Sequence, residues 1–153
     1  MAAKPPARAP LLPDLGCACA NIRRAARLVT QLYSEEMSLH VEPAQFALLS
    51  ALSRLPGASQ APLGLALGLD KSTLSRNLRL MRRNGWIEPV CAEDRRARGY
   101  HLTPAGKRIL TSAIDGWTRA QTKLRAALRP GEWETMNGVV GRVAEAAIAA
   151  RKK

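Results

Sequence analysis

The sequence predicts a mainly α-helical protein with one small β-hairpin. Apolar residues recur at helical spacing along most of the chain, and two short helical segments meet across a glycine-containing turn near residue 68. Two strand-like segments then flank a basic stretch at 92–98. We therefore expect a winged helix-turn-helix at 43–102, a helical dimerisation region at 14–42 and 103–153, and a flexible basic arm at 1–13.

Composition indicates a partner of opposite charge. The 153 residues carry 24 Lys+Arg against 12 Asp+Glu, a formal net charge of +12. A surplus of this size favours a polyanion, and nucleic acid fits because neutralised phosphates release counterions. A membrane surface would also attract the charge, but no segment approaches the ~20 apolar residues of a membrane span. Three cysteines are too few for a disulfide framework, so we expect a cytoplasmic protein that binds no membrane.

Two helices are expected before the turn motif. The first covers about 16–39, with Asp14 as a cap and apolar residues at helical spacing. Those residues are Ile22, Ala25, Ala26, Val29, Leu32 and Tyr33. The second begins at Pro43, a favoured residue in a first turn, and ends near 55–57. Its apolar stripe consists of Phe46, Leu48, Leu49 and Leu52.

The helix-turn-helix is predicted at 59–84. Ser59 opens a helix that ends at Gly68, and Pro62 and Gly64 make this helix short or weak. Asp70 is a good N-cap for the next helix, which ends near Asn84. Strand-like segments at 86–91 and 99–102 then enclose the basic stretch. They predict a wing, with an ordinary solvated hairpin as the alternative.

Two long helices are expected to close the chain. Thr103 and Pro104 are typical of a helix start, and 129–131 break the helix before a last one. The long helix has a four-three seam made of Gly106, Leu110, Ala113, Trp117, Ala120, Leu124 and Ala127. Such a seam packs on the chain's own core or meets a partner chain, and we favour a helix that does both. The last helix has an apolar side made of Trp133, Met136, Val140, Val143 and Ala147.

One face of the helix at 71–83 has the character of a DNA-reading surface. At 100° per residue, Leu74, Leu78 and Met81 lie opposite a polar face made of Ser72, Ser75, Arg76, Arg79 and Arg83. Arginine binds guanine edges in the major groove, and small hydroxyls hold phosphates or bases. A merely solvated basic face is the alternative. Arginines at the hairpin tip suit a narrow minor groove, and these are Arg95, Arg96 and Arg98.

Four segments resemble the multiple-antibiotic-resistance regulator (MarR) family. They are DKSTLSRNL at 70–78, GWI at 85–87, DRR at 94–96 and LTPAG at 102–106. The resemblance extends over about 20–150. It implies a homodimer on a palindromic operator, with the recognition helix in a major groove and the wing in the adjacent minor groove. It places Ser72, Thr73, Ser75 and Arg76 at the DNA, and Arg96 in the minor groove with Asp94 bracing it. We also expect Lys71 and Arg79 of the same helix to contact DNA.

The resemblance also implies regulation. Many members are repressors released by a small aromatic ligand bound between the dimerisation helices and the DNA-binding lobe. Here the lining would include Arg27, Tyr33, Phe46 and Trp117. Other members sense oxidants through a cysteine, and Cys17 and Cys19 lie near the start of the first helix. Residues two apart on a helix point ~200° apart, so this pair is a poor disulfide or chelate.

Other classes of function have weaker support. The sequence lacks the motifs of hydrolases, zinc proteases and dinucleotide-binding enzymes, so we expect no catalytic residue and no cofactor. His40 and His101 lack metal-ligand spacing with each other or with the cysteines. A sequence-neutral architectural DNA-binding protein would explain the charge equally well. It would coat DNA, whereas a regulator protects one short palindrome.

Overall fold

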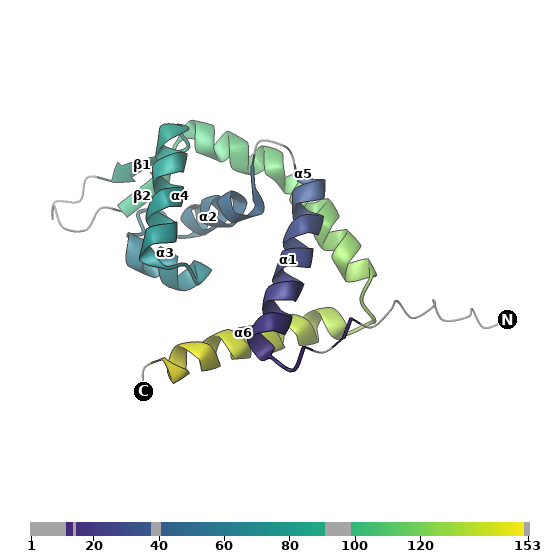
Figure 1. Ribbon diagram of the computed structural model, residues 1–153. Coiled ribbons are helices and arrows are strands. Elements are labelled where there is room, and N and C mark those ends of the chain that lie inside the picture. The colour runs from purple at the N-terminus through teal and green to yellow at the C-terminus, as the bar shows by residue number, and fades with distance from the viewer. Residues whose placement is uncertain (1–11, 14, 38–40, 91–98, 152–153) are drawn as a thin grey trace.

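The helices and the hairpin occur in the expected order. A computed structural model describes residues 12–13, 15–37, 41–90 and 99–151. Figure 1 shows α2 (Pro43–Arg54), α3 (Gln60–Leu67), α4 (Lys71–Arg83) and the hairpin gathered into one lobe. The long α5 (Pro104–Ala126) runs away from this lobe, α1 (Ala18–Glu36) packs against α5, and α6 (Glu132–Ala150) follows.

Local capping explains the turn motif. Glu42 and Gln45 form a capping box before α2, and Pro43 occupies its first turn. Helix α3 is short, with eight residues, and ends at Gly68 in the left-handed conformation, with φ of 63°. Asp70 then caps α4, as predicted. Gly68 at the end of α3 and Asp70 at the start of α4 therefore set the path of the chain between the two helices.

The predicted apolar stripes meet in one core. Leu74, Leu78 and Met81 of α4 are buried in the same cluster as apolar residues of α2, α3 and the hairpin. The remaining buried members from that lobe are Phe46, Leu48, Leu49, Leu52, Leu63, Ile87, Tyr100 and Leu102. Met37, Val41 and Ala113 belong to the same cluster. The lobe and the base of the α1–α5 unit therefore share a core.

The hairpin is extended by a contact that the sequence pattern did not predict. Strands β1 (Ile87–Val90) and β2 (Gly99–Leu102) pair antiparallel, with Pro89 opposite Tyr100. On the other edge of β2, Gly57 N–H donates to the Tyr100 carbonyl over 2.9 Å, and Tyr100 N–H donates to the Ala58 carbonyl over 3.1 Å. A Cβ on Gly99 would be 2.0 Å from the Gly57 carbonyl oxygen, so glycine permits this approach.

The seam of α5 packs largely within the chain, as one half of the prediction expected, and its contact with a partner chain stays a prediction. Its buried members Gly106, Ala113 and Ala120 lie along it, and Gly116 is buried beside them. A Cβ on Gly106 would be 2.0 Å from the Trp86 carbonyl oxygen, so α5 begins in direct backbone contact with the residue before β1. Ala127, at the far end, is exposed. The four-three spacing reflects close packing on α1 and the lobe.

Two helices bury none of their residues completely. Helix α1 begins at Ala18 with Cys17 as its N-cap and no side-chain cap bond, whereas the predicted cap, Asp14, is outside the described residues. Neither α1 nor α6 contains a buried residue. Among the described residues, no helix is both long and apolar enough to cross a membrane.

Candidate nucleic-acid interface

Helix α4 presents a basic outer face. Arg76 and Arg79 are exposed on it, together with Lys71 and Ser72 in the first turn. The opposite face is anchored by Leu74, Leu78 and Met81, each at most 2% exposed. Residues 71–83 include no acidic side chain. The helix is thus fixed by its core face and offers guanidinium donors to an anionic partner.

Asp70 organises the first turn of α4. Its carboxylate accepts the backbone N–H groups of Ser72 and Thr73, each over 2.9 Å. It also accepts both of their hydroxyls, each over 2.6 Å. The Ser72 and Thr73 hydroxyls, helped by the backbone bonds, hold the pKa of Asp70 well below its usual range. Asp70 is therefore ionised, and the two hydroxyls point their hydrogens at it.

Ser75 lies differently from the prediction. It is half-buried, and its hydroxyl donates to Gln60 Oε1 over 3.1 Å, which joins α4 to the start of α3. Its side chain therefore belongs to the contact between the two helices and is not a free member of the outer face. The helical period of 3.6 residues predicts that Ser75 lies near the border of the polar face of α4. It cannot predict that α3 packs beside that border.

The base of the wing adjoins α4 and contains a polar side-chain contact across the two strands. Strand β1 contacts α4, and Glu88 faces His101 across the hairpin, with Glu88 Oε1 and His101 Nε2 2.9 Å apart. The tip residues predicted to reach DNA lie outside the described residues. They are Asp94, Arg95, Arg96 and Arg98.

A groove lies beside this shared core, with residues of α1, α2, α3 and α5 in its lining. It has a volume of about 800 Å³ and is lined by three of the predicted residues, Tyr33, Phe46 and Trp117. The rings of Phe46 and Trp117 stack with centroids 5.9 Å apart, and burial raises the pKa of Tyr33. Arg27 is exposed on α1 and does not line the groove, which corrects that prediction. The cation in the lining is Arg54, from α2.

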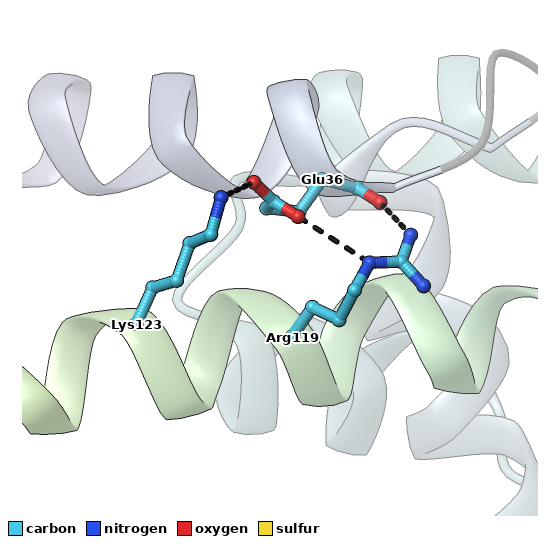
Figure 2. Close-up of polar contacts among 3 residues, drawn as sticks. All are labelled: Glu36, Arg119 and Lys123. Carbon is cyan, nitrogen blue, oxygen red and sulfur yellow. Dashed lines mark hydrogen bonds and ion pairs between the residues drawn. The ribbon is translucent and has the colours of Figure 1, made fainter.

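One wall of the groove is attached to α5 by charged side chains (Figure 2). The Glu36 carboxylate pairs with Lys123 and with Arg119 Nε, the latter over 3.3 Å. Arg119 Nη2 also donates to the Glu36 carbonyl oxygen over 2.7 Å. Lys123 above all, with Arg119, lowers the pKa of Glu36 from its ordinary value. Since Tyr33 and Met37 flank Glu36 and line the groove, these contacts fix that wall.

Cys17 and Cys19 are exposed, free thiols at the start of α1. Their oxidant-sensing role stays a prediction, and Cys91 and His40 are outside the described residues. Within the described part of the chain, no group of three His, Cys, Asp or Glu side chains could hold a metal ion.

Comparisons with known proteins agree with this architecture. A family model described as MarR family matches residues 41–97. The M. tuberculosis transcriptional regulator MosR, solved in complex with DNA, is 30% identical with a TM-score of 0.80, over 88% of this chain and 98% of that chain. The Streptomyces coelicolor regulator PcaV, solved with its natural ligand, is 28% identical with a TM-score of 0.79, over 89% and 98% of the two chains.

A curated relative points the same way. A candidate transcriptional regulatory protein for the hcr operon of Thauera aromatica is 26% identical over 125 residues, which is 81% of this chain and 72% of the relative. The helix-turn-helix with its basic α4, the hairpin beside it and these matches together establish that the chain belongs to the MarR family of DNA-binding transcription regulators.

Proposed function

We propose that this regulator acts as a homodimer on a palindromic operator and is a repressor that a small aromatic ligand releases. In this proposal α4 lies in the major groove and the wing reaches the adjacent minor groove. The observation that carries it is the basic outer face of α4, held rigidly over a buried leucine face. The tip residues Asp94–Arg96 and Arg98 keep their predicted DNA roles as part of the proposal.

The case for a second copy rests on α1 and α6. Val140 of α6 is 63% exposed, and further apolar residues of these helices are exposed, namely Ile22, Leu28, Val139, Val143 and Ile148. Most of the stability of a helix in a protein comes from packing of its apolar face against other elements. Links to α5 lie at the beginning of α6, where Arg125 Nη2 pairs with Glu134 over 2.9 Å and covers the Trp133 ring. A partner that covers the remaining turns would supply the missing core.

The effector proposal rests on the chemistry of the groove. Stacked Phe46 and Trp117 offer a planar apolar surface, and Tyr33 and Arg54 offer a hydroxyl and a cation at its border. An aromatic carboxylate matches both features. PcaV was solved with its natural ligand, which supports ligand control in a protein of this fold. To release DNA, the ligand must favour a geometry that does not fit the operator.

Substitution of Arg76 tests the placement of α4. Arg76→Ala should weaken binding to the cognate operator by about 1–3 kcal/mol if the guanidinium pairs with guanine. Arg151→Ala, at the end of α6, removes the same charge far along the chain and should have a much smaller effect. Operator affinity measured at one salt concentration compares the two. Equal affinities of Arg76→Ala and wild type would contradict the placement.

A thiol switch is the second candidate, because Cys17 and Cys19 are both exposed to oxidants. Peroxide treatment of wild type and of a Cys17→Ser, Cys19→Ser double variant tests it. Operator release by wild type alone would support oxidant sensing. Equal behaviour of the two proteins would remove it and leave ligand control.

A further inference from the structure

The hydroxyl groups around the first turns of α4 are already committed as donors within the chain. Ser72 Oγ and Thr73 Oγ1 donate to the Asp70 carboxylate over 2.6 Å, and Ser75 Oγ donates to Gln60 Oε1 over 3.1 Å. A hydroxyl has a single hydrogen and two acceptor lone pairs. Each of these oxygens therefore has only lone pairs left for an outside contact.

The bonds to Asp70 are difficult to exchange for a bond to DNA phosphate. A length of 2.6 Å is typical of a hydroxyl donating to an ionised carboxylate, which is a strong, charge-assisted bond. The same carboxylate caps α4 through two backbone N–H groups, so it cannot turn away without uncapping the helix. A hydroxyl that left Asp70 for a phosphate would also draw that phosphate toward a like charge.

We infer that Asp70 determines base specificity by making the first turn of α4 an acceptor surface. Because it holds the hydrogens of Ser72 and Thr73, their oxygens select bases that present an amino group, adenine N6 or cytosine N4, in the major groove. Guanine and thymine present a carbonyl oxygen at the corresponding atoms and are disfavoured there. This inference rests on the proposed placement of α4 in the groove.

The next turns of α4 have the opposite character. Arg76 and Arg79 are exposed and carry donors only, which suit O6 and N7 of guanine. The helix therefore presents acceptors at its N-terminal end and donors further along. The half-site that matches this order has an amino-bearing base next to the guanine contact.

Transition substitutions in the operator test the inference directly. Exchanging adenine for guanine, or cytosine for thymine, replaces the amino group by a carbonyl oxygen and keeps the ring size. Wild type should prefer the amino-bearing base by about 2- to 10-fold at one or two positions of each half-site, the value of a single net hydrogen bond. Ser72→Ala or Thr73→Val should reduce that preference to nearly one and leave the other positions unchanged.

Asp70→Asn is the sharpest variant, because asparagine caps helices about as well as aspartate. The amide oxygen of Asn at position 70 must accept the backbone N–H groups of Ser72 and Thr73. The amide nitrogen then takes the place of Asp70 Oδ2 beside Thr73 Oγ1 and donates to that hydroxyl oxygen. The Thr73 hydrogen then turns outward, and the preference at its position should disappear or reverse toward guanine or thymine. Thermal unfolding of the variant checks that the cap is intact.

Two outcomes would overturn the inference, and they are distinguishable. If Ser72→Ala and Thr73→Val weaken binding by the same factor on every sequence, or not at all, while Arg76→Ala still weakens cognate binding, the acceptor role is wrong and α4 still reads DNA. If Arg76→Ala also has no effect, the placement of α4 in the groove is wrong, and the inference is overturned with it.

Discussion

The carbonyl oxygen of Glu36 lies so close to Gly116 that a Cβ on residue 116 would be 2.5 Å from it. The same added atom would be 2.8 Å from the Met37 Cα, so α1 ends in backbone contact with α5. Arg119 Nη2 donates to the same carbonyl oxygen (Figure 2). The close crossing of α1 and α5 thus depends on the absence of a Cβ at Gly116 and on the Arg119 guanidinium.

Gly116→Ala should therefore destabilise the fold, although alanine is normally the better helix former. The added methyl meets backbone atoms that cannot turn aside, and overpacking of this kind typically costs about 1–3 kcal/mol. Denaturant unfolding measures the loss. Gly138→Ala is the matched control, because its Cβ would meet only a flexible Arg142 side-chain atom at 3.5 Å. We expect that variant to be more stable than wild type by about 0.5–1 kcal/mol. Equal shifts in both variants would contradict the close contact.

The Glu36 ion pairs predict a pH dependence with a definite sign. Because the folded-state pKa is lowered from the ordinary 4.5, the stabilisation is complete above that value and is lost as the pH falls through the folded-state pKa. The Glu36→Gln variant lacks this titration. The difference between the urea midpoints of wild type and Glu36→Gln should therefore be largest near neutral pH and shrink below pH 4.5. A difference independent of pH would show that the carboxylate charge contributes nothing.

The proposed dimer predicts a strong response to charge on α6. Val140→Asp would bury a carboxylate in the partner contact and should weaken association at least about tenfold. Gly138→Asp places the same charge about 160° around the helix and should have little effect. Sedimentation over a range of protein concentrations compares the variants. A wild type that sediments only as a monomer at micromolar concentration would refute the dimer.

The groove predicts that Arg54, and not Arg27, recognises an acidic effector. Arg54→Met should lower the affinity for an aromatic carboxylate by about 10- to 100-fold, the range expected for a charged hydrogen bond. Arg27→Met removes the same charge outside the groove and should keep the response. Operator release titrated with an aromatic acid and with its neutral amide gives the comparison. An identical loss in both variants would point to general electrostatics.

The wing yields a prediction that comes from the sequence alone. If Asp94 braces Arg96, then Asp94→Ala should weaken operator binding even though it removes a negative charge near DNA. Simple electrostatics predicts tighter binding. Operator affinity of this variant at fixed salt decides between the two signs.

Local signals made most of the fold predictable. Caps, proline in first turns and terminal glycines act within a few residues, so the limits of α2 to α5 follow from residues such as Pro43, Gly68 and Asp70. Contacts between distant segments were missed, as in the pairing of Gly57 with Tyr100 and of Gln60 with Ser75. Nothing in a periodic pattern encodes which element lies across from a given residue.

The candidate site was likewise predicted only in part from the sequence. Tyr33, Phe46 and Trp117 were predicted to share a pocket and do line one groove. Arg27 was grouped with them because it is near Tyr33 in sequence, but six residues on a helix turn the side chain by ~240°. The seam of α5 was ambiguous for another reason: small residues at four-three spacing allow close packing within one chain as readily as between two.

Neither edge of the hairpin offers a complete set of backbone groups to a third strand, which bears on aggregation. Tyr100 uses its backbone groups on residues 57 and 58, so the outer edge of β2 is occupied. Its cross-strand partner, Pro89, must then turn its own backbone outward on β1, since opposite residues in antiparallel pairs share the same direction of bonding. Proline has no N–H to offer there. The described hairpin thus exposes no complete strand edge for a neighbouring molecule to extend.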